Sequence, residues 1–127
     1  MLHVQSTFSG FSVDDLNAAK QFYSEVLGLE LDDAVGGTTI HLPGGAQAWM
    51  YEKADHVPAG YTMLNFNVSK IDEAHEALTK SGMEFEQYPD SRQDEKGIMR
   101  GKDHGMGPNI AWFTDPSNNI LSVLETT

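Results

Sequence analysis

An internal repeat is the feature that most constrains the fold of this chain. A shift of about 55 residues superimposes hydrophobic positions with the same spacing: Val13 falls on Val68, Leu16 on Ile71, Ala19 on Ala74 and Tyr23 on Leu78. One residue must then be skipped to bring Gly28 onto Gly82. Because two copies of one pattern form the same supersecondary unit, the repeat limits the architecture before any local pattern is considered.

The first copy is predicted to open with a strand over residues 6–13, where Phe11 and Val13 alternate toward a core. Asp14 is in position to cap the helix that follows, and Gly28 is suited to the left-handed conformation that ends it. Apolar residues spaced three and four apart give this helix one buried face.

A second strand follows Gly28 and includes Leu29 and Leu31, and a hairpin completes the first copy. Its strands are predicted at 38–42 and 47–52, on either side of a turn at 43–45 in which two glycines permit positive φ. By alternation, one face of the hairpin enters the core through Ile40, Leu42, Ala48 and Met50, and the other carries Thr39, His41, Gln47, Trp49 and Tyr51.

The second copy begins with an alternating strand at 63–68. Ser69 is predicted to cap the next helix, with Asp72 three residues later completing a weak capping box. A further strand is expected at 84–88.

The charged segment 89–108 is long for a loop in a compact domain. We therefore expect it to contain a short strand near 98–101 and to act as a lid. Strands at 109–114 and 120–125 form a closing hairpin.

Each copy thus follows the order strand-helix-strand-strand-strand, which indicates the α+β class. We predict a single domain over residues 1–127, with module one at about 6–52 and module two at about 62–125. The segment 53–61, which contains Pro58 and Gly60, is the linker between them.

Charge and composition exclude several classes of partner. The chain has 8 Lys and Arg against 19 Asp and Glu, and its formal net charge of -11 would repel nucleic acid and anionic membranes alike. It has no cysteine, so neither a disulfide nor a thiolate metal site is possible. No apolar run reaches the length of about 18 residues that spans a bilayer, and the first residues lack the pattern of a secretion signal. We therefore expect a cytoplasmic protein with small-molecule or protein partners.

Five short motifs are spread along the chain: Val13-Asp14-Asp15-Leu16, Phe22-Tyr23, Val26-Leu27-Gly28-Leu29, Asp115-Pro116 and Leu124-Glu125. Together they resemble the vicinal oxygen chelate superfamily, which includes glyoxalase I, extradiol dioxygenases, fosfomycin-resistance enzymes and bleomycin-resistance proteins. The resemblance covers nearly the whole chain. It implies two βαβββ modules whose mixed sheet curls into a cup with the helices outside, and it implies a homodimer.

In metal-dependent members of that superfamily, each module supplies two ligands to the cup, usually His, Glu or Gln. The positions of this chain that match them are Phe8, Trp49, Met63 and Ser122. Phenyl, indole and thioether groups offer a divalent metal no hard donor, and a neutral serine is a weak one. The resemblance therefore implies a cup without the usual metal site, and we predict no cofactor.

The predicted ligand-binding residues are side chains that face the cup, together with two cations of the long loop: Phe8, His41, Trp49, Tyr51, Met63, Asn65, Trp112, Ser122, Lys96 and Arg100. Aromatic walls with few polar groups suit a small, partly planar organic ligand. Two alternatives remain open. In the first, the inward residues fill the cup as a second core or form a dimer interface. In the second, the loop cations pair with nearby carboxylates and bind no ligand.

The leading hypothesis is metal-independent binding or sequestration of such a ligand, as the resemblance to bleomycin-resistance proteins implies. The alternative is a glyoxalase- or dioxygenase-like enzyme, a lyase, isomerase or oxygenase, that uses displaced ligands or His41 as its acid-base catalyst. A third hypothesis is an ancillary dimer that binds protein partners.

Overall fold

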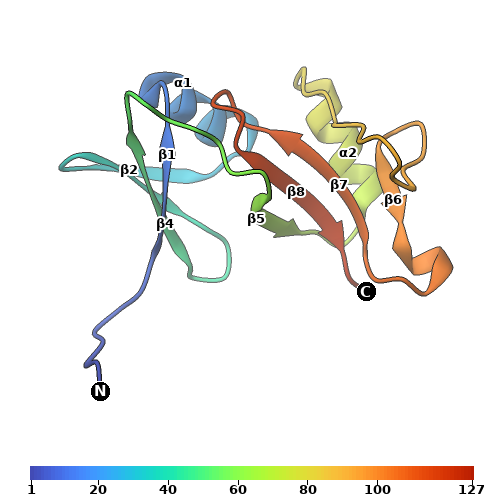
Figure 1. Ribbon diagram of the computed structural model, residues 1–127, viewed down its shortest axis with the longest axis horizontal. Coiled ribbons are helices and arrows are strands. Elements are labelled where there is room, and N and C mark those ends of the chain that lie inside the picture. The colour runs from blue at the N-terminus through green and yellow to red at the C-terminus, as the bar shows by residue number, and fades with distance from the viewer. The chain divides into compact units, whose positions relative to one another are not determined.

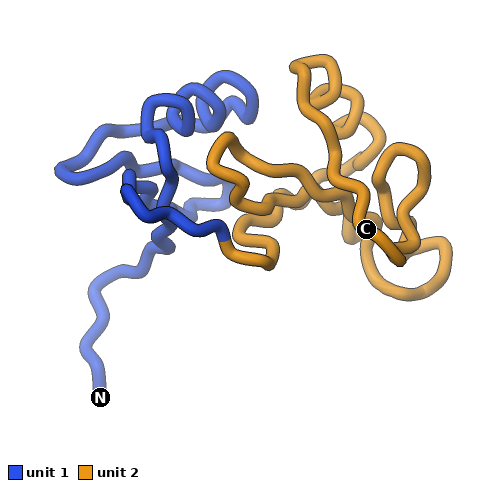
Figure 2. The backbone as a smooth tube through the Cα atoms, turned by 45° about the horizontal axis from the view of Figure 1, so that its top comes forward, with its two compact units in different colours: residues 1–58 blue, residues 59–127 orange.

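The computed structural model describes residues 1–127 and divides them into two compact units, Met1–Pro58 (unit 1) and Ala59–Thr127 (unit 2), coloured separately in Figure 2. The boundary falls inside the predicted linker at 53–61. The single domain over the whole chain stays a prediction.

Unit 1 is a four-stranded mixed sheet, here called sheet A, with a helix against one face (Figure 1). Its strands are β1 Ser9–Val13, β2 Glu30–Ala34, β3 Gly37–His41 and β4 Gln47–Glu52, in the spatial order β1-β4-β3-β2. Strand β1 is parallel to β4, and the other neighbours are antiparallel. The helix is α1 Leu16–Gln21, which continues as the π-helix η1 Phe22–Val26.

Unit 2 repeats this plan in sheet B. Its strands are β5 Thr62–Asn67, β6 Ile98–Arg100, β7 Asn109–Thr114 and β8 Ile120–Glu125, in the order β5-β8-β7-β6. Strand β5 is parallel to β8, as β1 is to β4. The helices are α2 Ile71–Lys80 and the short 3-10 helix η2 Gly101–His104. The α+β fold with a repeated βαβββ order is therefore confirmed.

The core of each unit lies between its sheet and its helix. In unit 1 its members include Phe11, Val13, Ala19, Tyr23, Ile40, Ala48 and Met50, and in unit 2 Ile71, Ile98, Ala111, Phe113, Leu121 and Val123. Leu42 was expected in this core but is only half-buried, because it lies just beyond the end of β3. The sheet face that carries no helix is called the open face below. No helix is long and apolar enough to cross a bilayer.

The π-helix accounts for the residue that the repeat has to skip. A π-helical turn contains one residue more than an α-helical turn, and here the N–H of Leu27 donates to the carbonyl of Phe22 at 3.1 Å. The inserted residue lies between Tyr23 and Gly28, whereas α2 stays α-helical over the equivalent stretch. The wider turn buries the consecutive rings of Phe22 and Tyr23, whose centroids are 5.2 Å apart in an edge-to-face contact.

Both predicted helix caps are wrong. Asp15, not Asp14, caps α1, and its side chain accepts the N–H of Ala18 at 3.1 Å. At α2 the capping position is Lys70 rather than Ser69, and its side chain makes no capping hydrogen bond. The carboxylate of Asp72 binds Arg100 instead of completing a capping box.

Glutamates at the ends of the last strands accept hydrogen bonds from the first N–H groups of both helices. Glu52 Oε1 accepts the N–H of Leu16 at 3.0 Å, and Glu125 Oε2 accepts the N–H of Ile71 at 2.8 Å. These pairs are equivalent in the repeat. Lys102 also donates to Glu125 Oε1 at 2.7 Å. That ammonium, and after it the backbone N–H of Ile71, hold the pKa of Glu125 below its ordinary value.

The strand predicted at 84–88 is also wrong. This segment makes one backbone hydrogen bond to β7, from the N–H of Glu86 to the carbonyl of Trp112 at 2.8 Å. The Gln93 side chain binds the segment at two further points. Its amide nitrogen donates to the Glu86 carbonyl, and its amide oxygen accepts the N–H of Tyr88. The short strand expected near 98–101 is present as β6, and it occupies the edge of β7.

Loss of either glutamate contact should lower the free energy of unfolding. Glu52→Ala removes the acceptor of the Leu16 N–H and should lower the free energy of unfolding by about 1 kcal/mol, the usual size of a lost helix cap. Urea denaturation at about pH 7 measures it. Glu84→Ala, at an exposed position of the irregular segment, is the control. An equal loss in Glu84→Ala would contradict the role of Glu52.

Glu125→Ala should cost more than Glu52→Ala, because Glu125 also binds Lys102. The pKa of Glu125 is lowered in the folded state, so its contribution is present above the ordinary glutamate value of 4.5 and is lost as the pH falls below it. The difference between the parent chain and Glu125→Ala should therefore shrink at about pH 3.

Candidate functional site

Glycines make room for the indole of Trp49 on the open face of sheet A. Trp49 lies opposite Gly10 on β1 and Thr39 on β3. A Cβ atom on Gly37 would lie 2.7 Å from the indole Nε1 and 2.4 Å from the carbonyl oxygen of Met50. No side chain larger than hydrogen fits there unless the strand moves, so the indole rests over the backbone at Gly37.

Tyr51 extends this aromatic surface. It follows Trp49 by two residues on β4 and so faces the same way. The two rings stack with centroids 4.8 Å apart and an interplanar angle of 24°. Both side chains are half-buried, which leaves part of each ring open to a ligand.

A groove of about 390 Å³ lies beside the indole. It is lined by Phe8, Ala34, Thr39, Gln47, Ala48 and Trp49. The lining side chains with polar groups are Thr39 with its hydroxyl, Gln47 with its amide and Trp49 with its indole N–H, and the rest of the lining is apolar. The volume falls in the usual range of small-molecule sites, about 300–1,000 Å³.

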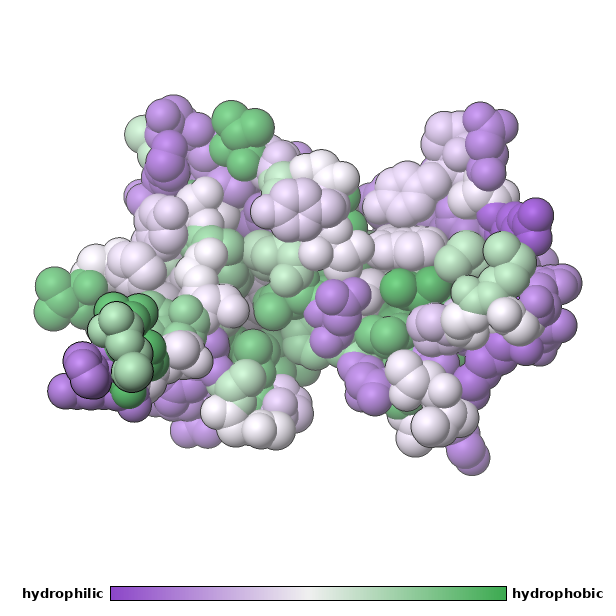
Figure 3. All heavy atoms as spheres, turned by 60° about the horizontal axis from the view of Figure 1, so that its bottom comes forward, coloured by the Kyte–Doolittle hydropathy of each residue, from purple (hydrophilic) through white to green (hydrophobic).

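Phe8 forms one wall of the groove and is 66% exposed. It lies before the start of β1, so the strand predicted from residue 6 is shorter than expected. Figure 3 shows hydrophobic residues at the surface between hydrophilic ones. In unit 1 the exposed hydrophobic side chains include Leu2, Val4, Phe8 and Val35.

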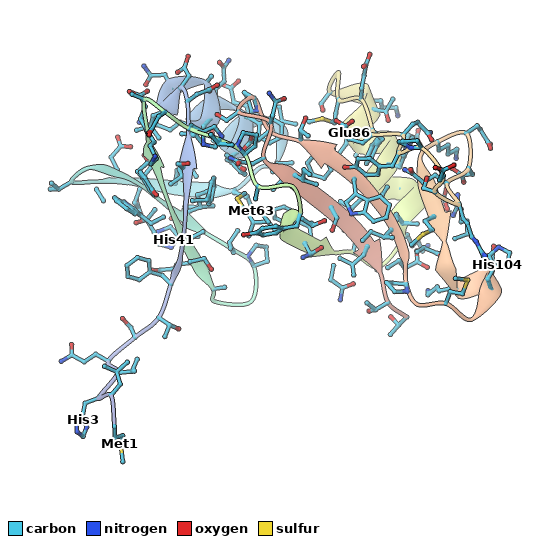
Figure 4. All side chains as sticks on the ribbon, in the orientation of Figure 1. Met1, His3, His41, Met63, Glu86 and His104 are labelled. Atoms are coloured by element: carbon cyan, nitrogen blue, oxygen red, sulfur yellow. The ribbon has the colours of Figure 1, made fainter.

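His41 lies at the edge of the groove rather than in its lining. On the open face its Nε2 contacts Asp32 Oδ2, and the amide of Gln47 lies 3.5 Å from its Nδ1. Figure 4 labels His41 beside sheet A and places His3 on the N-terminal arm away from the sheet. His41 therefore reaches the groove through Gln47.

The predicted residues of unit 2 form a separate set on the open face of sheet B. Ser122 is buried and donates from its hydroxyl to Asn65 Oδ1 at 2.6 Å. Trp112 Nε1 donates to the hydroxyl of Thr62 at 3.1 Å. Met63, labelled in Figure 4, is half-buried where the pairing of β5 with β8 shifts register.

Tyr88 packs edge-to-face on Trp112, with ring centroids 5.6 Å apart. Burial, and after it the charge of Glu86, raises the pKa of the Tyr88 phenol. Tyr88 was not among the predicted site residues.

Lys96 and Arg100 do not lie with the other predicted residues. Arg100 pairs with Asn109 across β6 and β7, which puts it on the helix side of sheet B, next to buried Ala111 and Ile98. Its guanidinium donates twice to Asp72 of α2, each at 2.8 Å, and its Nε donates to Asp94.

This pairing has a strong electrostatic effect. The Arg100 hydrogen bonds lower the pKa of Asp72 to about 2, with a smaller contribution from Lys96, and Asp72 in turn raises the pKa of Arg100. Pairing with carboxylates was the open alternative for the loop cations, and Asp72 is a partner that the sequence pattern did not indicate. Anion binding by Lys96 and Arg100 stays a prediction that requires exchange of Asp72 for the ligand.

The positions that match metal ligands do not fit a divalent ion. Phe8 and Trp49 present rings to the groove, Met63 presents a thioether, and the Ser122 hydroxyl is buried in its bond to Asn65. No group of three or more His, Cys, Asp or Glu side chains in the structure is arranged to hold a metal.

Of the residues that line the groove, only Phe8 and Trp49 were among the predicted site residues, and Ala34, Thr39, Gln47 and Ala48 were not. Gly37, which makes room for the indole, was also missed, although the Gly36-Gly37 pair is a visible signal. Its meaning depends on the position of Trp49 on another strand, which only the sheet register supplies.

Comparison with known proteins agrees with this architecture. The family model described as the Glyoxalase/Bleomycin resistance protein/Dioxygenase superfamily matches residues 2–123. No curated protein sequence matches the chain.

Solved structures share the fold at low sequence identity. The fosfomycin resistance protein FosX from Listeria monocytogenes has a TM-score of 0.71 and 16% identity, over 99% of this chain and 96% of that one. A putative glyoxalase family protein from Bacillus anthracis has a TM-score of 0.68 and 20% identity over all of both chains. Lactoylglutathione lyase from Agrobacterium tumefaciens has a TM-score of 0.67 and 18% identity, over 96% and 94%.

The side chains at the four positions that match metal ligands predict how the protein responds to metal ions. Zn²⁺, Mn²⁺, Fe²⁺ or Ni²⁺ should not raise its unfolding temperature, because an ion that does not bind the native state cannot stabilise it. An ion present at a hundred times its dissociation constant would add about 2.7 kcal/mol, which a thermal melt detects readily. Stoichiometric binding that His41→Ala or His104→Ala abolishes would contradict this prediction.

Proposed function

The chain belongs to the Glyoxalase/Bleomycin resistance protein/Dioxygenase superfamily, and on that premise we propose that it binds a small, partly planar aromatic ligand without using a metal ion. The ligand enters the groove on the open face of sheet A. The protein holds or sequesters it unchanged, in the manner expected of a bleomycin-resistance-like member.

The observation that carries this proposal is the stacked pair of Trp49 and Tyr51 beside an apolar groove. An aromatic side chain offers about 150–250 Å² of surface and prefers offset or edge contacts with another ring. A planar ligand that contacts the indole buries apolar area on both partners. Phe8 supplies a second wall, and its exposure leaves it available for contact.

The groove supplies selectivity through few polar groups, as small-molecule sites generally do. Thr39, Gln47 and the indole N–H of Trp49 are the side-chain groups of its lining that can form hydrogen bonds. For unit 2 we propose Met63, Asn65, Trp112 and Ser122 as ligand contacts on the open face of sheet B.

An enzymatic role is the second candidate, and the contact between His41 and Asp32 favours it. A carboxylate that fixes one nitrogen of an imidazole leaves the other as the proton acceptor of a general base, and at His41 that nitrogen is Nδ1, which would exchange the Gln47 amide for the substrate. Product formation from a bound ligand would distinguish this role from sequestration.

Trp49→Ala should weaken binding of a neutral bicyclic probe such as indole by about 1–3 kcal/mol, because it removes the main stacking surface. Nuclear magnetic resonance titration of the ¹⁵N-labelled protein measures the dissociation constant. Gly37→Ala should have a similar effect with the tryptophan still present, since the added methyl group would displace the indole.

Gly60→Ala is the matched control, because a Cβ atom there meets no atom within 4 Å. It should bind indole as the parent chain does. Unchanged affinity in both Trp49→Ala and Gly37→Ala would exclude the groove as the binding site.

We also propose that the protein is a homodimer. Strands β1 and β2 are the edges of sheet A, and the N-terminal arm before β1 exposes Leu2 and Val4. Sedimentation equilibrium should give a mass of about twice 14.0 kDa. A monomer at high micromolar concentration would rule out the dimer.

A further inference from the structure

Three side chains form a chain of contacts that ends in the groove. Asp32 on β2 contacts His41 Nε2, and the Gln47 amide lies 3.5 Å from His41 Nδ1. These residues occupy neighbouring strands of sheet A, and His41 and Gln47 are opposite each other in the register. Gln47 also lines the groove, whereas Asp32 and His41 do not.

Hydrogen-bond chemistry fixes the direction of each contact. An ionised aspartate only accepts, so His41 Nε2 must carry the hydrogen that points to Asp32. In the neutral imidazole the other nitrogen, Nδ1, then has a lone pair and accepts. The amide nitrogen of Gln47 donates to it, and Gln47 Oε1 remains for the groove.

Protonation reverses the last contact. A protonated imidazole donates from both nitrogens, so Nδ1 needs an acceptor. The only side-chain acceptor that Gln47 can offer is Oε1, which requires its amide to turn by half a rotation. The amide nitrogen of Gln47, a donor, is then presented to the groove in place of the oxygen.

We propose that Gln47 determines the hydrogen-bonding class of ligand that the groove selects, and that His41 sets the orientation of Gln47. With neutral His41 the groove accepts a hydrogen bond and selects aromatic ligands that carry an N–H or O–H. With protonated His41 the groove donates and selects ligands with a ring nitrogen or carbonyl acceptor. This inference rests on the proposed binding of an aromatic ligand in the groove.

The charged groups around His41 keep the protonated form compatible with the fold. Strand β2 presents Glu30, which pairs with His41 in the register, and Asp32 beside it. Strand β4 presents the neutral Gln47, and the turn at 42–46 contains no charged residue. A positive imidazole at this position therefore faces two carboxylates and no cation on the neighbouring strands.

Two neutral bicyclic probes distinguish the groove with neutral His41 from the groove with protonated His41. Indole donates a hydrogen bond through its N–H, whereas quinoxaline only accepts, and both are flat molecules of similar size. Their dissociation constants are measured by titrating the ¹⁵N-labelled protein at about pH 5.5 and about pH 8, on either side of the ordinary histidine pKa of about 6.5. From the lower to the higher pH, the preference for indole over quinoxaline should rise about tenfold, about threefold for each reversed hydrogen bond.

His41→Gln should make this preference independent of pH, and Gln47→Leu should abolish it. His56→Gln is the matched control, because His56 belongs to the same unit and binds Ser12 instead of the groove; it should keep the parent pH dependence. In the parent chain, the ¹⁵N shifts of the His41 ring should also identify Nδ1 as the unprotonated nitrogen at the higher pH.

The outcomes are distinct. If both probes bind in a manner that depends on Trp49 but their ratio is the same at both pH values, the role of Gln47 and His41 is overturned and the proposed function stands. If neither probe binds at either pH, the proposed function is overturned and this inference with it.

Discussion

A carboxylate at the end of the last strand, bound to the first N–H of the helix, is the contact on which each unit depends. The parallel pairing of β1 with β4 brings the carboxyl ends of both strands to the same edge of sheet A, and α1 begins at that edge. Glu52 therefore meets a helix start that has unsatisfied N–H groups and a positive dipole end. Glu125 does the same for α2. The contact fixes the helix on one face of the sheet, so the other face stays open.

Every second side chain of each strand lies on the open face of a sheet, so those side chains determine the shape and polarity of that face. In unit 1, Gly37 has no side chain and therefore lets the Trp49 indole lie against the strand. Tyr51 then stacks on that indole, and the pair becomes a rigid aromatic wall. The site therefore depends on a strand register that brings a glycine of β3 beside a tryptophan of β4.

The repeat predicted most of the fold because periodic burial and helix stops are local properties of the chain. Even the skipped residue has a structural counterpart, the π-helical turn that buries Phe22 and Tyr23 together. The predictions of the α2 cap and of the strand at 84–88 failed because residues far away in the sequence form the contacts that the local pattern assigned to neighbours. Asp72 lies three residues after the predicted cap Ser69, but α2 begins one residue later than predicted and Arg100, 28 residues farther along the chain, binds the Asp72 carboxylate. Residues 84–88 have a strand-like composition, but β6 occupies the available edge of β7.

The candidate site was harder to predict because the repeat constrains the core faces and leaves the open faces free to differ. Trp49 and Ser122 are equivalent in position, yet one presents a ring to a groove and the other is buried in a bond to Asn65. The Ser122 hydroxyl donates to Asn65 Oδ1 within unit 2, whereas Gln47 has an amide that is shared between His41 and the groove. A hydrogen-bonding group that keeps unused capacity is available to a ligand, and one whose partner is built in is not. Among residues related by one repeat, those with unused hydrogen-bonding capacity are therefore the ones through which the two copies acquire different chemistry.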